Sequence, residues 1–125
     1  SDIPEWEFIT QIAERSGCGI LLDVNNIYVN AYNHEFEAHT YLDAIPAALI
    51  GQVHVAGHTD HGDYLFDTHI GPIIDPVWDL FRRLVRRIGA VSTLIEWDSE
   101  VPDFEVLQRE AAIATRILAE EGVAV

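Results

Sequence analysis

Lysine and methionine are absent from this chain of 125 residues, and cysteine occurs once, as Cys18. A single cysteine excludes an intrachain disulfide, which fits a reducing compartment. Cys18 lies in the segment SGCGI, directly before an apolar run, and we expect it to be a small buried thiol rather than a reactive one. Because the sequence begins without methionine, directly at a helix-start signal, we expect the chain to be a piece of a longer protein.

Basic residues are scarce, because only 7 arginines stand against 21 acidic residues, and the formal net charge is -14. A chain with this charge repels phosphate backbones, so the composition argues against a nucleic-acid partner. Four arginines resemble a phosphate-binding patch, but they fall on the polar side of a predicted helix, and we interpret them as a solvated face. These are Arg82, Arg83, Arg86 and Arg87.

Long hydrophobic runs are also missing. No stretch approaches the roughly 18 to 20 apolar residues that cross a bilayer, so we expect no membrane partner. The first residues, SDIPEWEFIT, have neither the basic nor the apolar region of a signal peptide. No Gly/Ser-rich linker divides the chain, and its 49% hydrophobic content suffices for one core. We therefore expect a single domain over residues 1–125, as part of a larger one.

Helical and strand patterns alternate along the chain. Short apolar runs predict buried strands over 19–24, 51–57 and 91–97. Apolar residues at helical spacing predict a first helix that Asp2 caps and Gly17 ends, and two more around 35–45 and 75–88. A last helix is predicted between Asp103 as its cap and Gly122 as its end. The segments 25–34 and 58–72 remain as loops, and a loop as long as the second is often functional.

This order of elements predicts an α/β fold with a parallel sheet. Three strands alone would leave two open sheet edges, which is a liability for a free-standing domain. The simplest resolution is that these are the last three strands of a longer array of βα units. No dinucleotide-binding GxGxxG, GxSxG or P-loop motif is present.

One polar side chain stands near the C-terminal end of each predicted strand: Asp23, His54 and Glu96. Because side chains alternate along a strand, each can point to one face while aliphatic neighbours point to helices on the other. In a (β/α)8 barrel the C-terminal strand ends and the loops after them build the active site. These three residues are therefore expected to lie together.

Further candidates follow in the loops, namely Asn26, Asp67 and His69, the last two as a D-x-H pair in a short extended segment. Carboxylates and imidazoles without thiolates suit iron, manganese, zinc or cobalt, and three carboxylates can bridge more than one divalent cation. Each residue alone also has a structural interpretation, such as a cap or a satisfied core histidine. The candidate metal ligands are Asp23, Asn26, His54, Asp67, His69 and Glu96.

Two neighbours are candidates for supporting roles. His58 stands at the loop entrance and is expected to contact the ligands or the substrate, and Asp98 is expected to orient a ligand. The remaining polar loop residues are interpreted as solvated. These are His34, His39, Asp60, His61 and Asp63.

Four ordered segments, GCGILLDVNNIYVNAYNH, QVHVAGH, DTHIGPIIDPVWDLF and TLIEWDSEVP, resemble the multinuclear non-heme iron-dependent oxidative enzymes, the MbnB-like family of methanobactin biosynthesis. The wider superfamily is that of the xylose-isomerase-like barrels. The resemblance implies that the chain is the C-terminal portion of a (β/α)8 TIM barrel, with about three βα units and a preceding helix. It implies two or three mixed-valent irons at the mouth of the barrel, held here by the six candidate ligands. It also implies a bacterial cytoplasmic enzyme that uses O2 to modify cysteine-containing precursor peptides, often with a partner protein that presents the peptide.

Family members supply further ligands from earlier strands, and nothing in this chain matches those segments. We therefore expect the chain to be inactive alone, unless it pairs with the missing N-terminal half or with another copy. Two alternatives remain open at this point. One is a zinc- or manganese-dependent hydrolase or isomerase of the same superfamily, and the other is a non-catalytic fragment that binds no metal.

Overall fold

The structure is a computed structural model that describes residues 3–122. The helices are α1 (Glu5–Ser16), α2 (Val24–His34), α3 (Ala38–Ala44), α4 (Asp75–Ile88) and α5 (Phe104–Glu121), with a short 3-10 turn η1 (Ala47–Leu49). The strands are β1 (Ile20–Asp23), β2 (Ile50–Ala56), β3 (Thr59–Asp60), β4 (Leu65–Phe66) and β5 (Thr93–Glu96).

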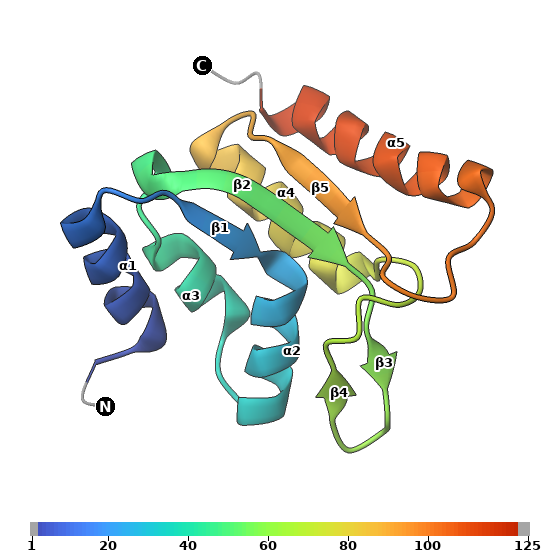
Figure 1. The fold of residues 1–125 in the computed structure, drawn as a ribbon, viewed down its shortest axis with the longest axis horizontal. Coiled ribbons are helices and arrows are strands. Elements are labelled where there is room, and N and C mark those ends of the chain that lie inside the picture. The colour runs from blue at the N-terminus through green and yellow to red at the C-terminus, as the bar shows by residue number, and fades with distance from the viewer. Residues whose placement is uncertain (1–2, 123–125) are drawn as a thin grey trace.

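The central sheet is parallel and has the order β1-β2-β5. Asp23 pairs with His54 across β1 and β2, and Ala56 pairs with Glu96 across β2 and β5. In Figure 1 the sheet lies in front of α3 and α4, and no helix crosses the face that is turned to the viewer. The α/β fold with a parallel sheet, predicted from the alternation of patterns, is thus confirmed.

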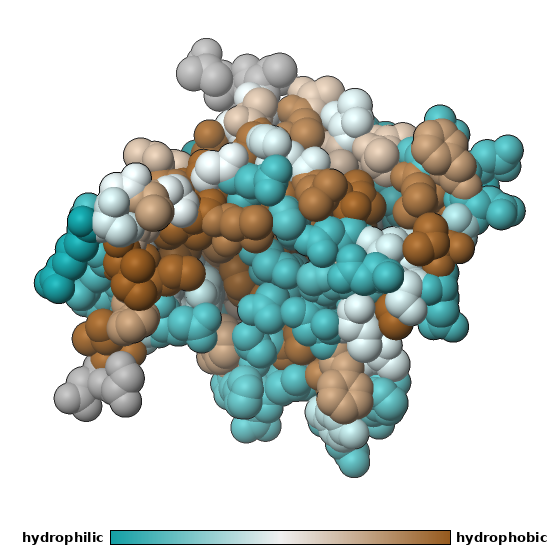
Figure 2. All heavy atoms as spheres, in the orientation of Figure 1, coloured by the Kyte–Doolittle hydropathy of each residue, from teal (hydrophilic) through white to brown (hydrophobic). Residues whose placement is uncertain are grey.

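The core lies between the sheet and the helices behind it. Val53 and Val55 of β2 are fully buried, as are Phe81 and Leu84 of α4. The opposite face of the sheet is open, because Leu21 and Leu94 are about half exposed. Figure 2 shows apolar residues over β1 and β5 on this open face, with hydrophilic residues between them.

The segment 25–34, predicted as a loop, is the helix α2, so that prediction was wrong. Its asparagines suggested a turn, since Asn disfavours helix interiors. The helix forms because Asp23 accepts a hydrogen bond from the Asn26 amide as its N-cap, and because Ile27 and Ala31 are buried against the core. Packing outweighed local propensity here, as it often does.

The first helix ends at Gly17 as predicted, in the left-handed conformation, whereas the predicted capping residue Asp2 lies outside the described residues. Cys18 is exposed, which contradicts its predicted burial. The backbone turns outward there, and the Cys18 amide donates to the Ser16 hydroxyl at the surface.

Other boundaries moved by a few residues. The helix expected around 35–45 is α3 and begins only at Ala38, because Glu35 ends α2 in the left-handed region. Asp103 stands at the start of α5, as predicted, but its side chain makes no capping hydrogen bond. The long loop 58–72 contains the antiparallel pair β3-β4. Among residues 3–122, no helix is long and apolar enough to span a membrane.

Three of the four arginines of α4 form ion pairs on the molecular surface, and the fourth, Arg87, donates to the Leu42 and Ile45 carbonyls. Arg83 binds the Asp43 carboxylate of α3 through two nitrogens, and Arg82 and Arg86 both reach Glu121 of α5. Their charge is thereby neutralised, which agrees with a solvated face and leaves little for a phosphate. Such exposed pairs add little to the stability of the fold, because solvent screens their charges.

Replacing Phe81 by alanine tests the position of the core. Since the ring is fully buried, we expect Phe81→Ala to lower the free energy of unfolding by about 3–5 kcal/mol. Urea denaturation followed by circular dichroism measures the loss. Phe8→Ala is the matched control, because that ring is 52% exposed, and the same change there should cost much less. Equal losses at both positions would contradict this core.

Candidate metal centre

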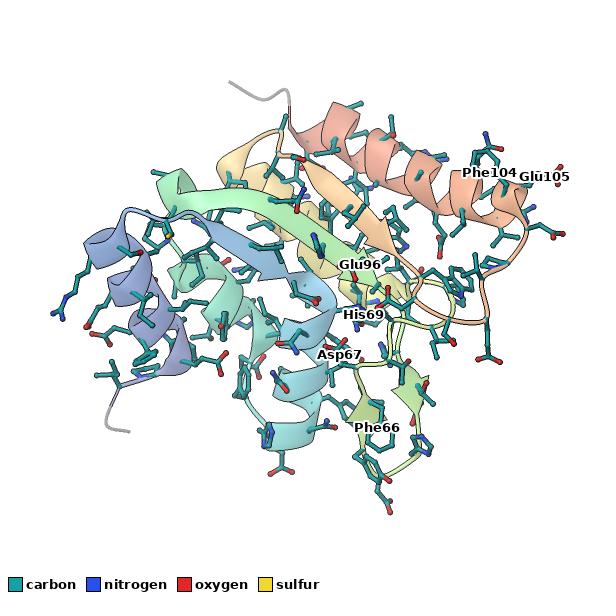
Figure 3. All side chains as sticks on the ribbon, viewed as in Figure 1. Phe66, Asp67, His69, Glu96, Phe104 and Glu105 are labelled. Atoms are coloured by element: carbon teal, nitrogen blue, oxygen red, sulfur yellow. The ribbon has the colours of Figure 1, made fainter. Side chains whose placement is uncertain are left out.

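Parallel pairing brings the strand-end residues to one edge of the sheet, as predicted. The Glu96 carboxylate contacts the His54 imidazole through Nδ1, and the second ring nitrogen of His54, Nε2, lies 2.9 Å from the Gln52 side-chain oxygen. Asp23 and Glu96 both reach His69, which comes from the loop after β4. Figure 3 shows Asp67, His69 and Glu96 grouped where the strands end.

The His69 imidazole lies at the centre of this cluster. Its Nε2 is 2.9 Å from Asp67 Oδ1 and 3.3 Å from Asp23 Oδ2, while its Nδ1 is 3.0 Å from Glu96 Oε2 and 3.2 Å from Asp98 Oδ2. One ring therefore touches four carboxylates from three separate segments.

The two ring nitrogens of His69 differ in the kind of contact that they make, although the distances are similar. Nδ1 makes a hydrogen bond to Glu96, whereas buried Nε2 makes none, because Asp67 and Asp23 approach it at hydrogen-bond distance but not in hydrogen-bond direction. A neutral imidazole carries one N–H and one lone pair. With the N–H at Nδ1, the lone pair of His69 is at Nε2, close to two carboxylate oxygens, and this arrangement fits a bound cation.

Two overlapping groups have ligand atoms close enough to hold an ion. One is Asp23, Asp67 and His69, and the other is His69, Glu96 and Asp98. Because a neutral His69 offers a single lone pair, it can serve only one of them. The hydrogen bond to Glu96 favours the first group. A second cation beside Glu96 would then need other ligands, and His54 is the imidazole in contact there.

The electrostatics of the cluster also favour a cation. Burial raises the pKa of Asp23, and repulsion from Asp67 and Glu96 adds to the effect. Burial alone would lower the pKa of His69, but attraction from Asp67, Asp23 and Glu96 outweighs it and raises that pKa. The repulsion at Asp23 and the attraction at His69 both come from the excess of negative charge, which a divalent cation neutralises.

Backbone geometry places His69 in the cluster. His69 has φ 57°, in the left-handed region that is uncommon for residues other than glycine. The D-x-H segment is therefore not extended at His69, contrary to the prediction, yet the two side chains still meet. The His69 carbonyl accepts from the Asp98 amide at 2.8 Å, which ties this loop to the segment after β5.

Asn25 was not among the predicted site residues, yet its side chain contacts Asp67 of the cluster. It is fully buried, and its amide nitrogen donates to Asp67 Oδ1 at 2.6 Å and to the Gly57 carbonyl at 3.1 Å. Its oxygen lies 3.0 Å from His58 Nδ1. The signal for this role was the asparagine pair after β1, although nothing in the sequence marks which partner each asparagine takes.

The remaining predicted residues border the cluster. Asn26 donates to Asp67 Oδ2 at 2.9 Å, while its oxygen accepts from Asn30, so it orients Asp67 in this structure. Its predicted role as a ligand stays a prediction. His58 is half-buried against the Tyr28 ring, and burial lowers its pKa, so it is neutral near pH 7. Asp98 touches His69 from the solvent side.

Comparison with known proteins found a matching family and similar bacterial proteins. The family described as RiPP precursor modification enzyme MbnB/TglH/ChrH matches residues 1–119, where RiPP denotes a ribosomally made, modified peptide. A UPF0276 protein of Anaeromyxobacter sp. is 52% identical over 117 residues, which cover 94% of this chain and 41% of that protein. A UPF0276 protein of Paraburkholderia phytofirmans is 47% identical, over 98% of this chain and 42% of its own length. The chain thus spans about two fifths of the length of these relatives.

Gly57 lets the ligand-bearing loop approach β2 closely. A Cβ at this position would lie 2.6 Å from the Ile70 carbonyl oxygen and still nearer to that of Gly71. We expect Gly57→Ala to displace the loop with His69 and to cost about 1–3 kcal/mol of stability. Gly51→Ala is the control, because nothing lies within 4 Å of a Cβ there. Thermal melts of both variants measure the difference, and equal melting temperatures would argue against this close approach.

Removing the His69 ring tests the centre itself. We expect His69→Ala to weaken binding of Mn²⁺ or Zn²⁺ by roughly 100-fold or more, measured by calorimetry. His34→Ala, an exposed histidine on α2, should bind as the unchanged chain does. Because its raised pKa makes His69 take up a proton at a higher pH than a free imidazole does, protons compete with the metal, and wild-type affinity should be lower at pH 6 than at pH 8. Unchanged affinity in His69→Ala would refute the assignment.

Proposed function

We propose a function for this chain from one premise: it belongs to the RiPP precursor modification enzyme family MbnB/TglH/ChrH. The function is iron-dependent oxidative modification of cysteine-containing precursor peptides. One observation carries the metal part of the proposal, namely the buried Nε2 of His69, which faces two carboxylates without a hydrogen bond. The relatives' names state no activity, so the peptide chemistry rests on family membership and on the donor set.

The chain supplies part of a larger fold in this proposal. Its parallel sheet ends in two unpaired edges, β1 and β5, and its open face carries half-exposed Leu21 and Leu94. The relatives are longer than this chain, and further βα units in such additional sequence would pair with those edges and cover that face as in a (β/α)8 barrel. They would also surround the metal centre with additional ligands, so the described residues alone are expected to lack activity.

The residues present suit iron as the metal. Asp23, Asp67 and His69 form one oxygen- and nitrogen-rich group, and Glu96 with His54 forms a contact beside it. Such donors without thiolate accept iron, manganese or zinc. Two neighbouring groups would hold two ions, and a third would need ligands from outside this chain. Bound iron would supply one-electron redox chemistry with O2.

The protein's own groups hold and orient these ligands. Asn25 and Asn26 each donate to one oxygen of Asp67, which turns the carboxylate toward His69. Glu96 holds the N–H of His69 at Nδ1 and so directs the lone pair of Nε2 inward. Gln52 accepts from Nε2 of His54 in the same way and leaves Nδ1 toward Glu96. Fixed tautomers of this kind are typical of metal-binding histidines.

The proposed substrate is a ribosomally made peptide whose cysteine thiolate enters the open side of the centre. A partner protein that presents the peptide, and a location in the bacterial cytoplasm, belong to the same proposal. Zinc or manganese would instead suit a hydrolase or an isomerase on the same fold. No contact among residues 3–122 favours that alternative, and the excess of acidic groups opposes a nucleic-acid substrate.

The decisive experiment uses the chain with whatever sequence flanks it in its gene, expressed aerobically with added iron. We expect two or three irons per protein and consumption of O2 when a cysteine-containing peptide is added. A peptide with serine in place of the cysteine is the control and should consume none. Metal analysis, Mössbauer spectroscopy and mass spectrometry of the peptide provide the readouts.

Two results would contradict the proposal. Stoichiometric zinc or manganese without O2 consumption would point to a hydrolase or isomerase. A protein that folds normally but binds no metal, with Asp23→Ala and His54→Ala unchanged in stability, would leave only a structural role.

A further inference from the structure

A compact cluster of aromatic rings caps the β3-β4 hairpin beside the metal centre. His61 stacks on Tyr64 with ring centres 5.5 Å apart, and Phe66 packs edge-on against both rings at 4.7 and 4.9 Å. The rings nevertheless face solvent, because Tyr64 is 45% exposed and Phe66 is 46% exposed. Figure 2 shows a small apolar patch on this hairpin among hydrophilic surroundings. We call His61, Tyr64 and Phe66 the hairpin cluster.

The hairpin is held in place by the helix beside it. Asn33 of α2 donates to the Leu65 carbonyl and accepts from the Leu65 amide, both at 2.8 Å, so its side chain pairs with β4 like a short strand. Leu65 itself is buried, and the Thr59 and Thr68 hydroxyls lie 2.9 Å apart at the base. The rings are therefore presented in a fixed arrangement, which lowers the entropy cost of binding a ligand.

The hairpin leads directly into the metal centre. Phe66 is followed by Asp67, whose carboxylate lies 2.9 Å from His69 Nε2. Figure 3 shows Phe66 below Asp67 on the same hairpin, with His69 and Glu96 beyond. A chain that rests on the hairpin cluster can thus continue to the centre over a few residues.

Aspartates are the only residues among Asp, Glu, Lys and Arg in the segment that forms the hairpin and its flanks. The segment 57–74 contains no lysine or arginine, and it carries Asp60 and Asp63 at the hairpin as well as Asp67. Aromatic faces attract cations, and nearby carboxylates strengthen that attraction. The surface therefore complements a positively charged side chain that lies next to an apolar one.

We propose that the hairpin cluster is a docking surface for a segment of the peptide substrate in which an arginine or lysine stands beside an aromatic residue. This inference rests on the proposed function, because it assumes that the substrate is a peptide. The cation would lie against Tyr64 and Asp63, and the aromatic side chain against Phe66. Docking there would place the residues that follow at the metal centre.

The test measures binding of two fluorescein-labelled synthetic peptides of ten residues, each with one cysteine, to the iron-loaded protein with its natural flanking sequence. One peptide carries Arg-Phe and the other Glu-Ser at the same two positions. We expect the Arg-Phe peptide to bind at least about tenfold more tightly by fluorescence anisotropy, with an affinity that falls as NaCl is added.

Three variants locate the site. Tyr64→Ser combined with Phe66→Ser should weaken binding of the Arg-Phe peptide by about tenfold. Asp63→Asn, which keeps the rings, should weaken it less and reduce its salt dependence. Phe104→Ser is the matched control, because that ring is 71% exposed on α5, and it should bind like wild type. All variants should keep the iron content of the wild type.

Several outcomes would overturn the docking proposal: no measurable binding of the Arg-Phe peptide, equal affinity for both peptides, or equal affinity in the double variant. A double variant that loses iron or changes its oligomeric state without peptide would also overturn it, since the rings would then be covered by the protein itself or by another copy. Hairpin-dependent binding without O2 consumption would instead leave the docking surface standing and contradict the oxidative function.

Discussion

Parallel pairing of three strands is the constraint on which the rest of the molecule depends. It sets Asp23 beside His54, and it sets Glu96 beside Ala56, two residues after His54 on β2. Because all three strands run in the same direction, the polar side chains at their C-terminal ends lie close together. Because side chains alternate along a strand, Val53 and Val55 point into the core, and burial of their aliphatic surface holds the polar strand ends in place.

Carboxylates gathered at the C-terminal ends of the strands are unfavourable without a compensating group, and in this structure they surround a single imidazole. His69 touches four carboxylates, and its backbone adopts a conformation that few non-glycine residues take. Such a conformation persists only when the surroundings determine it strongly. Here the close approach at Gly57 and the hydrogen bond from the Asp98 amide provide that determination. The conformation of this loop and the proposed cation site therefore depend on the same contacts.

Much of the fold and of the site could be predicted, because periodicity and strand ends are local properties. The three strands and the helix over 75–88 followed from apolar patterns, and the meeting of Asp23, His54 and Glu96 followed from their places near the C-terminal ends of parallel strands. The helix α2 was missed because its asparagines resemble a turn, while the burial that stabilises it comes from distant segments. Asn25 was missed for the same reason, since its partners are the Gly57 carbonyl and Asp67.

The sequence by itself determined the donor types, the excess of negative charge and the edge of the sheet at which the donors gather. These depend only on composition and on the period of the strands. Only the tertiary structure decided which nitrogen of His69 faces which carboxylate, and that Asn26 donates to Asp67. Those choices depend on contacts between residues that lie 27 and 41 positions apart in the sequence, whose distances and angles no local pattern contains.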